Sequence, residues 1–245
     1  MDNALLIGLS RQAALQRELD VIANNLANIN TGGFRSSKMR FEEYIMPIAA
    51  AAGMPAGEQS LSYVRDGAAM TDFTQGAIEQ TGNPVNVALN GAGWFTIQTK
   101  NGERYTRNGA FTLDAQGTLV TGTGDKVMTQ AGPVTFAAGE TDIAVSSDGT
   151  ISSSAGPKGR LKIMSFKDES TLKREGESLF SGEGAKPAEN VRVIGGSVEK
   201  SNVRAVSEIT RMVEVTRAYQ QLAKILADRD KLQQDAISSL GQLKN

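Results

Sequence analysis

The chain has 245 residues, 40% of them hydrophobic and 22% charged, and its 26 basic and 27 acidic residues leave a net charge of -1. There is no basic excess of the kind that binds nucleic acid, and the balance lets similar surfaces approach each other without strong repulsion. Cysteine and histidine are absent, which excludes disulfides and metal sites built from these residues. Asp and Asn turns could bind calcium, but no loop has the order of oxygen ligands of an EF-hand. We expect no cofactor and no metal ion.

The first predicted element is an amphipathic helix over residues 2–28, with Asp2 or Asn3 as its N-cap. Four apolar residues recur at steps of four, three and four, which places them on one helical face. They are Leu15, Leu19, Ile22 and Leu26. A single helix cannot bury such a stripe, so the pattern predicts a partner helix.

An asparagine- and glycine-rich stretch, residues 23–34, follows this pattern. Asparagine side chains compete for backbone hydrogen bonds, and Thr31-Gly32-Gly33 supplies the permissive backbone that ends a helix. One interpretation is therefore an ordinary helix C-terminus with an Asn/Gly cap. The other is an assembly surface, because Asn24 and Asn28 share a helical face and carboxamides both donate and accept hydrogen bonds. Phe34 follows as an apolar anchor.

Two less regular segments come next. Residues 35–46 have an apolar edge and are expected to form a loop or a short element. Residues 47–60 are rich in Ala, Gly and Pro, which is typical of a linker, with a short surface helix through the alanines as the alternative.

From about Leu61 the apolar period changes to two, which predicts strands. The candidate strands lie near residues 85–89, 95–97, 104–107, 118–121, 125–128, 134–136, 143–145, 150–152 and 160–166. Asn101-Gly102 and Asp148-Gly149 predict tight turns. Many short strands with glycine between them favour a β-sandwich or an irregular barrel-like core, with Trp94 inside. A helical turn is expected near residues 170–174.

No pattern in this region carries recognisable chemistry. Gly91-Ala92-Gly93 is followed by a strand-like run and not by a helix, so it predicts a turn or bulge and not a nucleotide loop. Paired carboxylates can hydrolyse sugars without histidine, but the acidic residues form no such constellation and are typical of solvated surface charge. We therefore expect no catalytic residue and no enzyme.

The last predicted element is a long helix that opens at Ser201-Asn202-Val203, with Ser201 or Asn202 as N-cap. One apolar face follows a heptad pattern and a second face lies beside it, which implies more than one helical neighbour. The first face contains Ala205, Ile209, Met212, Thr216, Tyr219, Ala223 and Leu226, and the second Val215, Leu222, Ile225 and Leu232. A dimeric coiled coil, which needs only one face, is the alternative.

Several stretches resemble the rod and hook proteins of the bacterial flagellum. Residues 23–34 match the family signature Ala-Asn-Asn-Leu-Ala-Asn-x-x-Thr-x-Gly-Phe at every fixed position. Ser-Asn-Val at 201–203 and Arg-Ala-Tyr-Gln at 217–220 are similar to a second signature. Residues 89–95, 105–111 and 117–120 resemble the shared core domain of that family.

The resemblance implies a structural subunit of the basal-body rod, whose terminal helices build an inner tube while the β domain faces outward. It implies an assembly interface at the two signatures. These interface residues are Asn24, Asn25, Leu26, Ala27, Asn28, Thr31, Gly33, Phe34, Ser201, Asn202, Val203, Arg217, Ala218, Tyr219 and Gln220. The implied partners are other rod subunits, proximal and distal, and the flagellar export apparatus. The implied location is the rod within the periplasm, reached without a cleaved signal peptide.

Together these observations predict an α+β chain in which terminal helices pair as an antiparallel coiled coil and a central all-β core lies between them in the sequence. The expected divisions are residues 1–46, 47–60, 61–194 and 195–245, and we expect proteolysis to leave roughly residues 61–194. The opening residues look most like the proximal-rod type, with the distal-rod type as the alternative. Other classes left open are a β-rich carbohydrate-active enzyme with a helical oligomerisation stalk and a coiled-coil adhesin.

Overall fold

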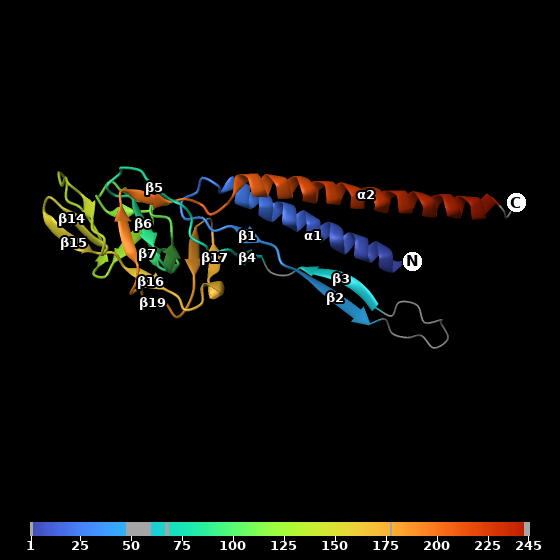
Figure 1. Ribbon diagram of the computed structural model, residues 1–245, viewed down its shortest axis with the longest axis horizontal. Helices are drawn as coiled ribbons and strands as arrows, with labels where there is room; N and C mark the ends of the chain where they lie inside the picture. The colour runs from blue at the N-terminus through green and yellow to red at the C-terminus, as the bar shows by residue number, and fades with distance from the viewer. Residues whose placement is uncertain (1, 48–59, 67–68, 177, 243–245) are drawn as a thin grey trace. The chain divides into compact units, whose positions relative to one another are not determined.

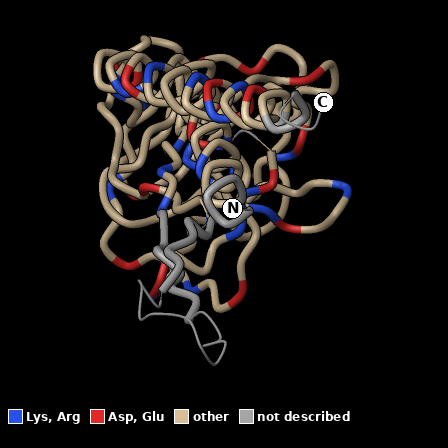
Figure 2. The backbone as a smooth tube through the Cα atoms, turned by 90° about the vertical axis from the view of Figure 1, so that its right-hand side faces the viewer, with Lys and Arg blue, Asp and Glu red and all other residues tan. Residues whose placement is uncertain are grey.

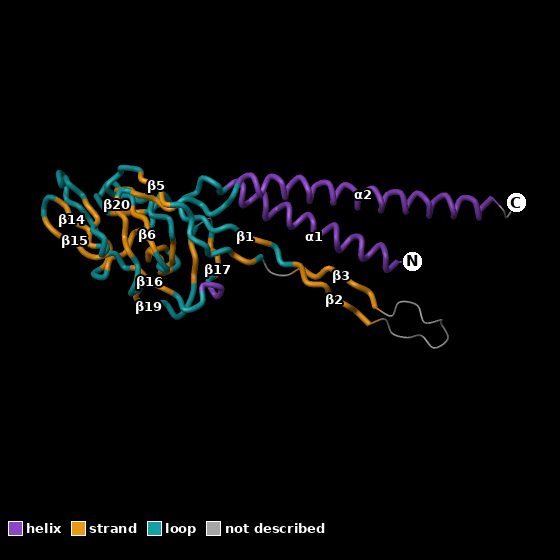
Figure 3. The backbone as a smooth tube through the Cα atoms, in the orientation of Figure 1, coloured by secondary structure: helices purple, strands orange, loops and turns teal. Residues whose placement is uncertain are grey.

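The computed structural model describes residues 2–47, 60–66, 69–176 and 178–242. The chain divides into two compact units. The helical unit comprises Met1–Leu26, Ser37–Met70 and Ala205–Asn245, and the β unit comprises Ala27–Ser36 and Thr71–Arg204. Helix dominates the described part of the first unit, and strands and loops make up most of the second (Figure 3).

Two helices, α1 (Asp2–Ala27) and α2 (Ala205–Gln242), lie side by side in the helical unit and run in opposite directions (Figure 1). Three side-chain contacts between them record this direction. Gln12 Nε2 donates to Tyr219 Oη at 3.0 Å, and Arg211 Nε donates to Glu18 Oε1 at 2.6 Å. The third joins Asn25 Nδ2 to Glu208 Oε2 at 3.3 Å. The predicted antiparallel pairing of the terminal helices is therefore confirmed.

The apolar stripe predicted for α1 lies on its sheltered side, where Ile22 is buried and Leu15, Leu19 and Leu26 are half-buried. Gly8 lets α2 approach closely, because a Cβ atom there would lie only 2.7 Å from Leu226 Cδ2. The two helices differ in length, with 26 residues in α1 and 38 in α2. At 1.5 Å per residue these are about 39 Å and about 57 Å, so α1 cannot accompany α2 along its whole length.

The helical unit also contains a β-hairpin that the sequence analysis did not predict. Strand β2 (Phe41–Pro47) pairs antiparallel with β3 (Ser60–Asp66), with Phe41 opposite Asp66 and Pro47 opposite Ser60. The expected linker over residues 47–60 thus has both ends in strands, and its remaining residues lie outside the described part of the chain. Two further short strands, β1 (Ser37–Lys38) and β4 (Met70–Thr71), form a two-stranded sheet.

The β unit is built from many short strands, all paired antiparallel. Its main sheet has ten strands, with β17-β18-β8-β7-β11-β10-β9 as the continuous path. The strands of this path are β7 (Trp94–Thr99), β8 (Gly102–Thr106), β9 (Thr112–Leu113), β10 (Leu119–Val120), β11 (Lys126–Thr129), β17 (Lys173–Glu175) and β18 (Leu179–Ser181). Attached to it are β12 (Gly132–Pro133), β16 (Ile163–Ser165) and β19 (Lys186–Pro187).

Smaller sheets complete the unit. Strands β13 (Ala144–Val145), β14 (Thr150–Ser153) and β15 (Gly156–Arg160) form one of them. Strand β20 (Arg192–Gly195) pairs with β6 (Val87–Asn90), and β21 (Ser197–Glu199) pairs with β5 (Ile78–Gln80). A 3-10 turn, η1 (Glu169–Thr171), lies close to the predicted helical turn. The architecture is therefore a set of antiparallel sheets, as the all-β expectation required.

Two apolar clusters form the core of this unit. The larger gathers residues such as Val87, Phe95 and Ile151 from several sheets, and the smaller is made of Trp94, Tyr105, Leu172 and Phe180. Trp94 is 1% exposed, which confirms its predicted core position.

The predicted turns are confirmed, and one predicted strand is shorter than expected. Gly102 and Thr99 pair at the end of the β7–β8 hairpin, and the Gly149 N–H donates to Ser146 O at 2.9 Å. Gly91 lies between β6 and β7 with a φ of 113°, as a turn glycine. The strand expected at residues 134–136 is reduced to an isolated antiparallel bridge between Thr135 and Thr118, flanked by hydrogen bonds from Leu119 N–H to Val134 O and from Phe136 N–H to Gly117 O.

Charge is spread evenly over the fold. Basic and acidic residues are interspersed along the backbone (Figure 2), in keeping with the balanced composition. Neither of the two described helices combines the length and the hydropathy needed to cross a lipid bilayer.

Candidate assembly site

The segment that follows α1 in the chain enters the β unit through a turn that only glycine fits. The Gly33 N–H donates to Glu199 O at 2.8 Å, and Gly33 has a φ of 65°. A Cβ atom at this position would lie 2.3 Å from Asn108 N and 2.4 Å from Arg107 C, well inside van der Waals contact. The glycine of the first signature is therefore required by backbone packing within one chain.

Phe34 is completely buried directly after this turn. The Arg174 guanidinium lies 4.7 Å from the Phe34 ring centroid and 5.1 Å from that of Phe180, at cation–π distance from both. Its Nη2 donates to Arg35 O. Burial lowers the pKa of Arg174, and the charge of Arg35 lowers it further.

An ion cluster at Glu199 lies next to this contact. Arg35 Nη1 is 2.6 Å from Glu199 Oε1, and both side chains are 0% exposed. Arg107 Nη1 is 3.5 Å from Glu199 Oε2, and the Gly76 N–H donates to Oε1 at 2.9 Å. Burial is the main cause that lowers the pKa of Arg107 to about 10, Glu199 opposes this shift, and Arg35 adds to it.

Trp94 forms part of the wall of this ion cluster. The guanidinium carbons of Arg107 and Arg35 lie 5.5 Å and 6.0 Å from the centroid of its ring. Its Nε1–H donates to Glu169 Oε1 at 2.9 Å, so the buried indole nitrogen is satisfied. The Trp94 ring therefore packs against the guanidinium groups of both Arg35 and Arg107.

The second signature meets the first at Asn202. Its Oδ1 accepts from the Ser36 N–H at 2.7 Å, and its Nδ2 donates to Asp72 O at 2.8 Å and Thr74 O at 3.0 Å. Its backbone N–H donates to Phe34 O at 3.3 Å. Asn202 thus joins two separate segments, and the prediction that the helix opens at residue 201 is corrected, because α2 begins at Ala205.

Asn25 and Asn28 of the first signature also bond within the chain. Asn25 is 1% exposed, donates to Ser37 O at 2.8 Å and accepts from the Ser37 N–H at 2.9 Å. Asn28 accepts at Oδ1 from Thr31 Oγ1 at 3.1 Å, and its carbonyl accepts from the Thr31 N–H at 3.2 Å. The bonds of Asn25 tie α1 to Ser37, and those of Asn28 close a turn after the helix, so both carboxamides are engaged inside the chain.

The residues predicted for an assembly interface therefore fall into three groups by exposure in the single chain. Those buried are Asn25, Asn28, Gly33, Phe34 and Val203. Those half-buried are Leu26, Thr31, Ser201, Asn202, Ala218 and Tyr219. Those exposed to solvent are Asn24, Ala27, Arg217 and Gln220.

Helix α2 leaves large apolar side chains in solvent. Their exposed fractions are 79% for Val206, 50% for Ile209, 44% for Val213, 61% for Ile225 and 70% for Leu232. Ile209, Ile225 and Leu232 belong to the two predicted apolar faces, whereas the sequence analysis missed Val206 and Val213. The spacing of seven residues between these two valines was the available signal.

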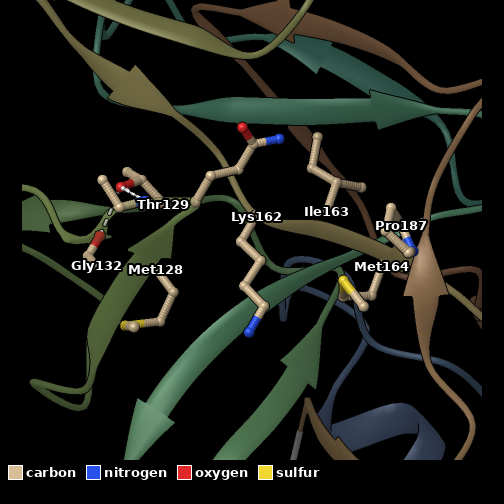
Figure 4. Close-up of a pocket in the computed structure, with 9 residues that line it drawn as sticks. Met128, Thr129, Gly132, Lys162, Ile163, Met164 and Pro187 are labelled. Atoms are coloured by element: carbon tan, nitrogen blue, oxygen red, sulfur yellow. Dashed lines mark hydrogen bonds between the residues drawn. The ribbon is translucent and has the colours of Figure 1, made fainter.

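Two pockets of the β unit differ in their lining: one has a single titratable residue, and the other is lined by Glu103, Arg104, Lys173 and Glu183 among others. The first, of about 550 Å³, lies beside β11 and β16 and is lined by Met128, Ile163, Met164 and Pro187 among others (Figure 4). Its one titratable lining residue is Lys162, whose Nζ is 2.6 Å from Glu103 Oε1. Among the described residues no group of three or more acidic side chains is placed to hold a metal ion.

The Glu199 ion cluster was not found by sequence reasoning. Arg35, Arg107 and Glu199 lie far apart in the sequence and follow no periodic pattern. The geometry is that of a structural protein: two paired helices, a β unit that binds its own signature segments, and large apolar residues of α2 that are exposed in the single chain.

Comparison with known proteins agrees with this class. Three family profiles match: the flagella basal body rod protein at residues 5–35, the flagellar hook protein FlgE/F/G D1 domain at 88–153, and the flagellar basal body rod FlgEFG protein C-terminal at 194–239. The chain is 37% identical to the flagellar basal-body rod protein FlgF of Caulobacter vibrioides, over 99% of this chain and 100% of the relative. It is 30% identical to FlgF of Mesorhizobium japonicum, over 98% and 99%. It is 33% identical to the rod protein FlgG of Agrobacterium fabrum, over 94% and 96%.

The chain belongs to the flagellar basal-body rod protein family, as a structural subunit of the FlgF type. It is therefore not an enzyme, and the carbohydrate-active and adhesin alternatives fall away. Membership of the rod family implies assembly with other rod subunits.

Proposed function

We propose that the chain takes its place in the proximal part of the rod and assembles there through α1 and α2, so that the rod transmits torque for motility. The observation that carries assembly through the helices is the set of apolar side chains that α2 leaves in solvent. The proximal position rests on the similarity to FlgF proteins. Burying such side chains between subunits is favourable by roughly 25 cal/mol per Å² of apolar surface.

The unequal lengths of the helices give a second reason. Antiparallel pairing that brings Gly8 against Leu226 places residue 2 level with residue 232. Residues 233–242 of α2 then extend beyond the described part of α1. An isolated helical end of this length is marginal in water, so neighbouring subunits are the expected source of its packing.

The assembly interface proposed here uses the predicted signature residues in two ways. The exposed ones, Asn24, Ala27, Arg217 and Gln220, contact neighbouring subunits directly, together with the exposed apolar residues of α2. The buried ones shape the segments from which the helices leave the β unit. The proposed partners are proximal and distal rod subunits and the export apparatus, and the proposed location is the periplasmic rod, reached without a cleaved signal.

A triple variant tests the role of α2. We expect Val206→Ser, Ile225→Ser and Leu232→Ser together to leave the far-ultraviolet circular dichroism of the purified chain nearly unchanged, because all three side chains are exposed. In a motile bacterium that lacks its own FlgF, the triple variant should fail to restore swimming and should be absent from purified basal bodies.

A matched control keeps the number and kind of introduced residues. Gln221→Ser, Asp228→Ser and Lys231→Ser replace exposed polar residues of the same helix and should restore motility. Normal swimming of the apolar triple variant would refute assembly through this surface. Labelling the chain in intact rods places it along the axis, and a distal position would favour the alternative of a distal-rod role.

A further inference from the structure

Two segments that lie far apart in the sequence close on each other inside the β unit. We call residues 31–36 and 199–203 together the clasp. Three hydrogen bonds join its two halves: Gly33 N–H to Glu199 O, Ser36 N–H to Asn202 Oδ1, and Asn202 N–H to Phe34 O. The first half begins at Thr31, a few residues after α1 ends at Ala27, and the second ends at Val203, just before α2 begins at Ala205.

A buried charge arrangement holds the clasp. Arg35 comes from the first half and Glu199 from the second, and both side chains are fully enclosed. Arg107 of the sheet approaches the same carboxylate. The Nε atoms of Arg35 and Arg107 are buried and make no hydrogen bond within the described residues. Both guanidinium groups share the Glu199 carboxylate, and its loss would leave the buried cation of Arg35 uncompensated. Arg107 would keep its hydrogen bond to Gly91 O at 2.6 Å and the attraction of Glu169.

We infer that the clasp closes within a single free chain, before assembly, and that Glu199 is the positioning residue that locks it. The two signatures then act first inside the subunit, by fixing the segments from which both helical arms start. This inference goes beyond the proposed function, which concerns contacts between subunits. It also predicts a folded core larger than residues 61–194, because that range omits Phe34, Arg35, Glu199 and Asn202.

Amide hydrogen exchange on the purified full-length protein, kept dilute enough to be monomeric, tests the inference. In the wild-type chain the amides of Gly33, Ser36 and Asn202 should exchange at least 100-fold more slowly than in an unstructured peptide. In Glu199→Gln these amides should exchange at least tenfold faster than in the wild type. The amides of Ile97 and Val127, which lie in the larger apolar cluster, should keep their wild-type rates.

Glu79→Gln is the matched control. It removes the same charge from an exposed carboxylate, which forms an ion pair with Lys200. Glu79 lies on β5, the strand that pairs with the strand of Glu199. Its exchange at Gly33, Ser36 and Asn202 should stay within about twofold of the wild type. A second variant, Arg35→Gln with Glu199→Gln, should exchange more slowly at these amides than Glu199→Gln alone, because one uncompensated cation has been removed.

Two results would overturn the inference. Fast exchange of Gly33, Ser36 and Asn202 in the wild-type monomer would mean that the clasp closes only on assembly. An equal rise at Ile97 and Val127 in Glu199→Gln would mean that Glu199 stabilises the whole unit and does not lock the clasp. If Glu199→Gln does not fold, Glu199 likewise stabilises the whole unit and its role as a lock is overturned, while the wild-type rates decide whether the clasp is closed in the free chain. None of these measurements depends on incorporation into a rod.

Discussion

Asn202 accepts a hydrogen bond from the backbone N–H of Ser36 at 2.7 Å, which ties the second signature of the family to the segment directly after the first. The same side chain donates to the carbonyl groups of Asp72 and Thr74. One carboxamide therefore satisfies backbone groups from two other segments, which explains why an asparagine, with both a donor and an acceptor, occupies this position.

Removing this carboxamide should destabilise the β unit. In Asn202→Ala the Ser36 N–H and the Asp72 carbonyl lose their partners, and we expect the free energy of unfolding to fall by about 2 kcal/mol. Urea denaturation measures the change. Asn190→Ala, at an exposed position, should cost less than about 0.5 kcal/mol. Equal effects of the two substitutions would argue against the network.

Replacement of Gly33 should be costly for a steric reason. Both Gly33 and Gly82 have positive φ, 65° and 71°, so alanine at either position pays a conformational cost of about 1–2 kcal/mol. Only at Gly33 does the new Cβ atom meet backbone, at 2.3 Å, whereas nothing lies within 4 Å of it at Gly82.

We therefore expect Gly33→Ala to lower the urea midpoint clearly more than Gly82→Ala. The difference between the two variants reports the clash alone, because the conformational cost is common to both. A Gly33→Ala protein as stable as Gly82→Ala would mean that the turn at Gly33 is not packed as described.

Acid should weaken the protein partly through Glu140. Its carboxylate accepts hydrogen bonds from Lys158, from Ser153 and from the Ala137 N–H, and these lower its pKa from 4.5 to about 2. A carboxyl group whose pKa is lower in the folded than in the unfolded state stabilises the fold above pH 4.5. That contribution is lost as the pH falls from 4.5 towards 2.

Urea midpoints measured between pH 2 and 6 test this. Glu140→Gln should show a smaller loss of stability across the window from 4.5 to 2 than the wild type. Glu189→Gln, at an exposed carboxylate, should follow the wild-type curve. An unchanged pH dependence in Glu140→Gln would show that the carboxylate is not held by these hydrogen bonds in solution.

The pairing of α1 with α2 can be tested by a disulfide, since the chain has no cysteine of its own. Leu226 Cγ, the atom that a cysteine sulfur would replace, lies 3.5 Å from a Cβ atom built at Gly8. A disulfide S–S bond is ~2 Å long, so a sulfur at this Cγ position is within bonding reach of a sulfur attached to the Cβ atom at residue 8, and Gly8→Cys with Leu226→Cys should oxidise readily within one chain.

Gel mobility without reductant, at low protein concentration, detects the loop closed by this bond. Leu9→Cys with Leu226→Cys is the control, because the side chain of Leu9 is 48% exposed and points to another side of the helix. Equal oxidation of both pairs would contradict a fixed register between the helices in the free chain.

Local patterns were enough to predict the elements that depend on neighbours in the sequence. The period of the apolar residues identified both helices, and the glycine turns at residues 102 and 149 were found from two-residue signals. The hairpin of β2 and β3 was missed because its strands are joined by the Ala-, Gly- and Pro-rich stretch, which reads as a linker.

By itself, the sequence determined that this protein has two amphipathic terminal helices, a strand-rich centre and the signatures of the rod family, because periodicity and turn chemistry are local properties. Only the tertiary structure decided that Arg35, Arg107 and Glu199 share one buried site and that Asn202 bonds to Ser36 and does not cap α2. It also decided which apolar residues of α2 stay exposed. The physical reason is that ion pairing, burial and hydrogen bonding of backbone groups depend on which distant segments come into contact. The spacing of residues along the chain does not predict those contacts.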